Sequence, residues 1–122
     1  MRLYLDNNYQ PGIFEIISKV HSLQSPVEYE IIYREWSDEY KAGDTIVFLI
    51  NLNKKKIDRA ALGYFKDGYK VFIYRKPYDA LFDPYKQALV MMSHWRKILE
   101  TIEGNSEACI YSINNRNLEQ LK

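Results

Sequence analysis

Apolar residues in this chain follow two spacings, one typical of buried strands and one typical of amphipathic helices. Five short apolar runs predict strands at residues 1–5, 29–33, 45–51, 69–74 and 108–113. The run from Thr45 to Asn51 is nearly all apolar and β-branched, a composition found in strands that are covered on both faces of a parallel sheet. We therefore expect this run to be the central strand.

Apolar residues that recur about every 3.6 positions predict three helices, over residues 13–23, 54–66 and 84–104. The second is expected to end at Asp67-Gly68, because glycine favours the turn that closes a helix. The third has the clearest start, with Asp83 as the N-cap and Pro84 at the first helical position. It continues to Gly104.

Strands that alternate with helices predict a fold of the α/β class, because two neighbouring parallel strands need a crossover of a dozen or more residues. We expect a three-layer sandwich with a mostly parallel central sheet of about five strands, formed as one domain over residues 1–122 with a polar tail at 113–122. Only 11 residues separate Tyr33 from Thr45. Either a short helical turn covers Asp38 to Lys41, or these two strands are not neighbours.

Composition narrows the class of protein further. The net charge of +1 supplies no overall field for binding a polyanion, so a nucleic-acid surface would have to be a local patch. A single cysteine excludes a disulfide within the chain, and no apolar run is long enough for a membrane-spanning helix. We expect a cytoplasmic protein with no membrane partner.

Carboxylates are the main candidates for chemistry, since the five glycines are scattered and the two histidines lie far apart in predicted helices. Asp6 follows the first apolar run and precedes a polar turn. A carboxylate there would emerge at the carboxyl edge of the sheet, where open α/β folds gather ligands, and it could hold Mg²⁺ or Mn²⁺. The structural alternative is an aspartate that caps the following helix.

Three segments together resemble a known family. They are Leu5-Asp6-Asn7-Asn8 with Pro11, the block Lys56-Ile-Asp-Arg-Ala-Ala-Leu62, and Val71-Phe-Ile-Tyr-Arg-Lys-Pro77. The chain is similar in these segments to the PIN-like domains, in particular the small VapC-type toxin branch. The resemblance implies a metal-dependent ribonuclease, often the toxin of a toxin–antitoxin pair, that holds Mg²⁺ or Mn²⁺ between three or four carboxylates.

The same resemblance suggests further site residues. A second acid is expected near Trp36, and two registers compete, one giving Glu35 and the other Asp38 with Glu39. Asp58 lies where relatives carry an acid ahead of Arg-Ala-Ala-Leu. Relatives end the central strand in a glycine-aspartate pair, but this chain has Asn51, which could be only a neutral ligand.

Basic residues form a candidate RNA-binding patch. Lys54, Lys55 and Lys56 with Arg59 follow the predicted central strand, and Arg75 follows the next one. These side chains could hold a phosphate backbone at the rim of the sheet. Stacking on bases is a further role for Trp36 and the 11 tyrosines, although tyrosines are also common core residues.

The sequence is compatible with two functions. The first is a PIN-like metal-dependent endoribonuclease with Asp6, Asp38 and Asp58 as catalytic residues, and with Asp6, Glu35, Asp38, Asn51 and Asp58 as candidate metal ligands. The alternative is a catalytically inactive PIN-like module that binds RNA or protein, which Asn51 favours. The partner candidates are RNA, a small antitoxin protein and a second copy of the chain in a homodimer.

Overall fold

The structure of the chain is a computed structural model. It describes residues 1–6, 9, 11–24, 29–33, 35–50, 54–74, 84–114 and 117–122. Within these ranges, none of the helices has the length and apolar character needed to cross a membrane.

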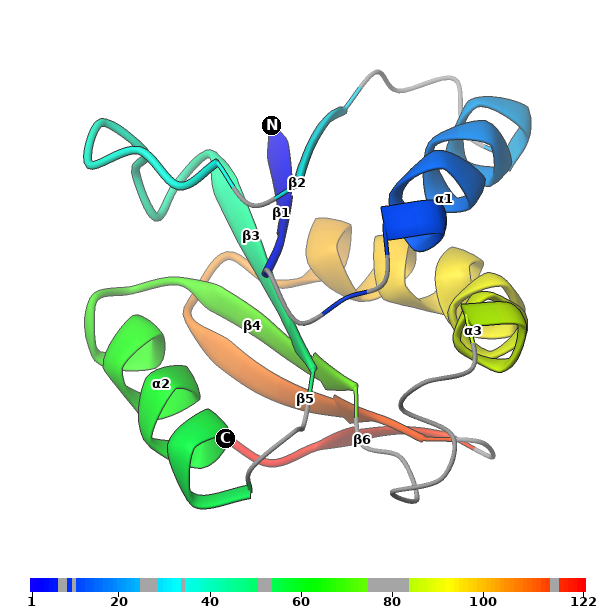
Figure 1. The fold of residues 1–122 in the computed structure, drawn as a ribbon. Helices are drawn as coiled ribbons and strands as arrows, with labels where there is room; N and C mark the ends of the chain where they lie inside the picture. Colours follow the sequence, from blue (N-terminus) through cyan, green and yellow to red (C-terminus); the bar gives the residue numbers. More distant parts are fainter. Residues whose placement is uncertain are drawn as a thin grey trace.

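Strands and helices alternate along most of the chain (Figure 1). The strands are β1 (Arg2–Leu5), β2 (Glu30–Tyr33), β3 (Thr45–Ile50), β4 (Lys70–Tyr74), β5 (Cys109–Ile113) and β6 (Leu118–Gln120). The helices are α1 (Pro11–Gln24), α2 (Lys54–Lys66) and α3 (Pro84–Gly104). The three predicted helices and five predicted strands are therefore confirmed, with α1 beginning two residues earlier than its apolar pattern suggested.

One six-stranded sheet runs through the molecule in the order β2-β1-β3-β4-β5-β6. The first five strands pair in parallel, and β6 pairs antiparallel with β5. Every residue of β3 is buried, which confirms the predicted central strand. β1 lies between β2 and β3, so the short link from Tyr33 to Thr45 joins strands that are not neighbours.

The C-terminal segment differs from the expected polar tail. Leu118–Gln120 forms β6, and Leu121 continues the pairing by donating its backbone N–H to the Ile110 carbonyl at 2.7 Å. The mostly polar sequence hid this edge strand, because an edge strand buries little and its hydrogen bonds come from the backbone.

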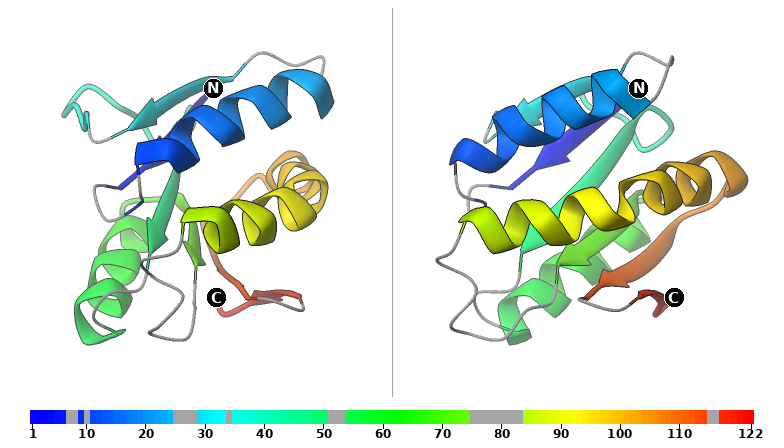
Figure 2. Two further views of the ribbon diagram at one scale, coloured as in Figure 1. Left: turned by 45° about the vertical axis from the view of Figure 1, so that its right-hand side comes forward. Right: turned by 90° about the vertical axis from the view of Figure 1, so that its right-hand side faces the viewer.

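Helices cover both faces of the sheet, giving the expected three layers (Figure 2). α1 and α3 lie side by side on one face, where Phe48 and Trp95 are fully or almost fully buried. Between these helices, the Trp95 indole N–H donates to His21 Nδ1 at 3.2 Å. α2 covers the other face over β3, β4 and β5.

Segment 35–44 covers the remaining part of the α2 face. The Trp36 ring packs edge-on against Tyr4 of β1 and against Tyr64 of α2, with ring centroids 5.0 and 5.3 Å apart. Asp38 and Glu39 lie in an exposed turn, in which Ser37 Oγ accepts the Glu39 N–H at 3.2 Å. This aromatic segment therefore takes the place of a crossover helix.

The crossovers do not all have the same hand. α2 carries the chain from β3 to β4 and α3 carries it from β4 to β5, in the same direction across the sheet but on opposite faces. Two such connections must have opposite hands. The β4–α3–β5 unit is the left-handed one (Figure 2), an arrangement found in only about 2% of parallel crossovers.

The end of α2 fixes where β4 begins. Gly68 has a φ of 95° and follows the helix, as predicted for Asp67-Gly68. The Tyr69 N–H donates to the Tyr64 carbonyl and the Gly68 N–H to the Phe65 carbonyl, both at 3.0 Å. These two bonds form a Schellman motif, which requires a left-handed residue and therefore favours glycine.

Candidate functional site

Asp6 lies at the point where the sheet changes its direction of winding. β1 has β2 on one side and β3 on the other, and the helices that follow β1 and β3 lie on opposite faces. In open α/β sheets, ligands bind at the carboxyl ends of the strands next to such a switch point. Asp6 directly follows β1 and is therefore at this edge.

The sheet backbone holds the Asp6 carboxylate. The Asp6 N–H donates to the Phe48 carbonyl at 3.1 Å, and Asp6 Oδ2 accepts the Ile50 N–H at 3.2 Å. The side chain thus continues the hydrogen bonding between β1 and β3 beyond the last residue of β1. Asp6 is only 7% exposed, and such burial of a carboxylate is costly unless hydrogen bonds compensate it.

Tyr9 fastens the backbone just after Asp6. Its N–H donates to the Asp6 carbonyl at 3.3 Å, and its hydroxyl donates to the Leu49 carbonyl at 3.1 Å. The Tyr33 hydroxyl in turn donates to the Tyr9 carbonyl at 2.7 Å. Tyr9 is fully buried, so these bonds connect the ends of β1, β2 and β3 in the interior.

Three tyrosine hydroxyls lie close enough to Asp6 for its negative charge to affect their pKa values. Burial, Tyr64 and then Asp6 raise the pKa of Tyr4 to about 12. Burial and then Asp6 also raise the pKa of Tyr9 and of Tyr64. All three hydroxyls are therefore neutral at physiological pH, and can donate hydrogen bonds close to a negative charge.

The predicted second acid lies in segment 35–44. Glu35, Asp38 and Glu39 are all exposed, and the Glu35 carbonyl accepts the Tyr40 hydroxyl at 3.1 Å. Among the described residues, no three His, Cys, Asp or Glu side chains are grouped as a metal centre would need. The choice between Glu35 and Asp38 as a partner of Asp6 stays a prediction.

The remaining predicted site residues fall in different places. Asp58 is half-buried on α2 and lines a pocket over β4 and β5. Lys55, Lys56 and Arg59 are exposed on α2. Lys54 begins this helix, but its side chain is outside the described part of the structure, as are Asn51 and Arg75.

Sequence reasoning missed the three tyrosines beside Asp6. Tyr4 had a detectable signal, because residues two apart on a strand point to the same face. Tyr64 had none, since it lies far away in the sequence. The tyrosines also offer less stacking surface than expected: Tyr4, Tyr9, Tyr69 and Tyr74 are buried, whereas Tyr85 is 71% exposed.

Comparisons of the chain with models of known protein families, with curated proteins and with solved structures find no match. The site must therefore be interpreted from its own geometry. That geometry is a buried, backbone-anchored carboxylate at a switch point, with neutral phenol donors beside it and a basic helix face following the adjacent strand.

Proposed function

We propose that this protein is a PIN-like metal-dependent ribonuclease whose centre is built around Asp6. The observation that carries the proposal is the burial of this carboxylate at the switch point, where Oδ2 accepts the Ile50 N–H. An aspartate that only capped α1 would not need to be buried between two strands. A carboxylate fixed at this edge suits a divalent cation.

The available donors fit a weakly held Mg²⁺ or Mn²⁺. Such ions often bind one or two protein carboxylates and complete their coordination with water and substrate phosphate. Asp6 meets this minimum, with Glu35 or Asp38 and Asn51 as further candidates. When bound, the ion would lower the pKa of a coordinated water that attacks the phosphodiester.

The chain's own residues would position the substrate around this ligand. The Asp6 backbone and side chain are fixed by Phe48 and Ile50, so the carboxylate keeps its direction. The neutral hydroxyls of Tyr4 and Tyr64 can donate to phosphate or ribose oxygens near Asp6. As phenols of raised pKa, they do so without adding negative charge that would repel RNA.

RNA would be held by the basic start of α2. Lys55, Lys56 and Arg59 are exposed there, and α2 follows the carboxyl end of β3, the strand next to Asp6. We include Lys54 and Arg75 among the proposed RNA-binding residues. No acid occupies the first turn of α2, although acids are favoured at helix N-termini. A helix that begins with three lysines is consistent with selection for an anionic partner.

A second candidate is a PIN-like module that binds RNA or protein without cleaving RNA. Two features favour it: Asn51 stands where the PIN-like domains that the chain resembles carry an acid, and no group of three His, Cys, Asp or Glu side chains that could hold a metal occurs among the described residues. If the protein is an active toxin, its expression should arrest growth, a small antitoxin should relieve the arrest, and Asp6→Ala should abolish it.

Metal-titrated cleavage of a labelled single-stranded RNA tests the proposal. Wild type should cleave with Mn²⁺, Asp6→Ala should not, and Asn51→Asp should cleave faster because it adds a carboxylate. Asp67→Asn, an exposed acid after α2, is the matched control. Cleavage that survives Asp6→Ala would refute the site, and binding without cleavage in all variants would favour the inactive module.

A further inference from the structure

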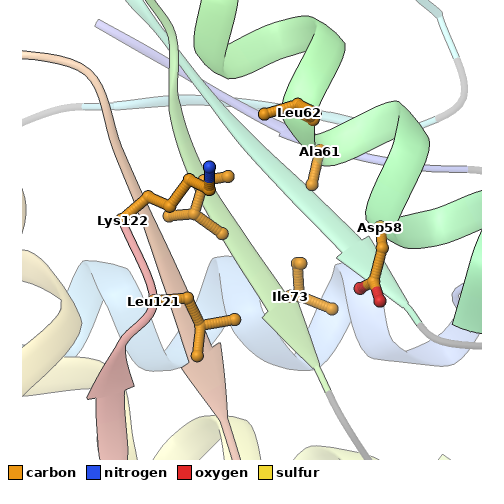
Figure 3. Close-up of a pocket in the computed structure, with 7 residues that line it drawn as sticks. Asp58, Ala61, Leu62, Ile73, Leu121 and Lys122 are labelled. Carbon is orange, nitrogen blue, oxygen red and sulfur yellow. The ribbon is translucent and has the colours of Figure 1, made fainter.

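The two edges of the sheet differ in how they are protected against pairing with another strand. β6 forms one edge; it is short, and its Glu119 and Gln120 are exposed. Just beyond it, Leu121 and Lys122 line a pocket next to α2 (Figure 3). A short edge strand with a charged side chain discourages pairing with another chain.

β2 forms the other edge and lacks these protections. Among the described strands, only β1 pairs with it. Its sequence, Glu30-Ile-Ile-Tyr33, contains no lysine or proline. Its one charged residue is held toward β1, because Arg2 Nε lies 3.6 Å from Glu30 Oε2. A strand of this kind is a template for pairing with another strand.

The hydrogen bonds of β2 show which of its backbone groups face outward. The Glu30 N–H donates to the Met1 carbonyl at 3.0 Å, so the backbone of Glu30 faces β1. In a strand, the backbone groups of successive residues point to alternate sides within the plane of the sheet. The N–H and carbonyl of Ile31 therefore point away from β1, toward the outer side of the edge.

An apolar stripe on α1 faces away from α3. Ile16, Val20 and Leu23 follow one another at helical spacing, and Ile16 and Leu23 are 36% and 86% exposed. His21 marks the side of α1 that faces α3, because it accepts the Trp95 N–H. At about 100° per residue, Ile16 and Leu23 lie roughly 140° and 160° around the helix from His21.

This stripe lies next to β2. Val20, at its centre, packs partly against the same core as Ile31 of β2, so the stripe runs along the border between the buried and exposed sides of the helix. α1 contacts β2, and both lie at the same end of the sheet (Figure 2). The outer edge of β2 and the α1 stripe thus form one surface, which we call the β2 edge surface and define by Ile16, Val20, Leu23 and Ile31.

We propose that the β2 edge surface binds a second copy of the chain in a symmetric dimer, with the two β2 strands antiparallel around Ile31. A two-fold axis perpendicular to the sheet lets the two Ile31 residues exchange N–H to carbonyl hydrogen bonds. The same axis keeps both α1 helices on one face of the joined sheet, where their stripes meet. This inference goes beyond the proposed nuclease function and does not depend on it.

A second copy fits both parts of this surface. A single peptide strand from another protein would pair with Ile31 but would leave Ile16 and Leu23 in water. The charges beside the stripe also permit self-association, because Glu15 and Lys19 are both exposed and cancel each other. The basic start of α2, in contrast, would repel its own copy, since like charges placed together across an interface are costly.

Sedimentation velocity of the full chain over a concentration series measures the dimer. Wild type should reach twice the monomer mass at high concentration. Leu23→Glu should weaken the dimer about ten-fold or more, because each copy would bring a charge into an apolar contact. Leu89→Glu is the matched control, since Leu89 is 46% exposed on α3, outside the β2 edge surface. It should leave the dimer unchanged.

A second variant tests the strand pairing by itself. Ile31→Pro removes an N–H that points away from β1, and proline is tolerated on an edge strand in that position. Its circular dichroism should match that of wild type, while its dimer should be at least ten-fold weaker. In wild type, the Ile31 amide should exchange with deuterium more slowly as the protein concentration rises, a measurement that decides the pairing even if the proline variant does not fold.

The outcomes are decisive and separate from those of the nuclease. A monomer at every concentration, an Ile31 amide whose exchange ignores concentration, or a dimer disrupted by Leu89→Glu but not by Leu23→Glu would overturn the proposal. A dimer that depends on Leu23 and Ile31, in a protein without Asp6-dependent cleavage, would uphold it while refuting the nuclease. Cleavage that depends on Asp6 in a strictly monomeric protein would do the reverse.

Discussion

Replacing Asp6 separates its structural role from its proposed chemical role. Asp6 Oδ2 accepts the N–H of Ile50, which is fully buried. Asp6→Ala leaves that N–H without this acceptor, which should cost about 1–3 kcal/mol of folding free energy. Asp6→Asn keeps an oxygen acceptor in the same place and should stay within about 1 kcal/mol of wild type. Both changes remove the charge that a divalent cation would need.

Urea unfolding with and without Mn²⁺ measures both effects. With an m-value of about 2 kcal/mol/M, the loss expected for Asp6→Ala moves the midpoint down by roughly 1 M. Mn²⁺ at ten times its dissociation constant should raise wild-type stability by about 1.4 kcal/mol and leave both variants unchanged. The reasoning fails if the alanine and asparagine variants are equally stable, or if Mn²⁺ stabilises either of them.

Two more predictions concern the α2 face. Gly68→Ala should lower the free energy of unfolding by about 1–2 kcal/mol, because a side chain is strained at a φ of 95° and its Cβ would lie 3.4 Å from that of Ala42. Gly104→Ala, with open space around it, is the control. Equal stability of the two variants would contradict the argument. The pKa of Tyr4 is raised to about 12 from 10.0, so its contribution to stability is complete below pH 10 and is lost as pH rises toward 12. Unfolding free energies at pH 9–12 should fall less steeply in Tyr4→Phe than in wild type or in the exposed control Tyr85→Phe.

The elements were predictable where local signals agreed. Three features could each be inferred from a few neighbouring residues: the buried strand that begins at Thr45, the start of α3 at its proline, and the end of α2 at the following glycine. The order of the strands could not be predicted in this way, because it depends on which face of the sheet each helix packs against. The short link from Tyr33 to Thr45 gave the one clue, and its second interpretation, that these strands are not neighbours, is confirmed.

The position of Asp6 is the part of the candidate site that the sequence pattern predicted most directly. Asp6 follows an apolar run, so its place at a sheet edge could be inferred from the pattern. Its neighbour Tyr64 could not be inferred, because Tyr64 lies near Asp6 only through tertiary packing on the α2 face. Of the three tyrosines near Asp6, only Tyr4, two residues earlier on the same strand, had a signal in the sequence spacing.

The left-handed β4–α3–β5 unit has a consequence for the order in which the chain folds. A right-handed unit returns its helix to the sheet through the natural twist of its strands, and can form early from local contacts. A left-handed unit lacks this help, so α3 needs a surface already present on its face. α1 offers that surface, through the contact of His21 with Trp95. We therefore expect the β1–α1–β2 unit, which emerges before the C-terminal half during synthesis, to provide the surface on which α3 docks.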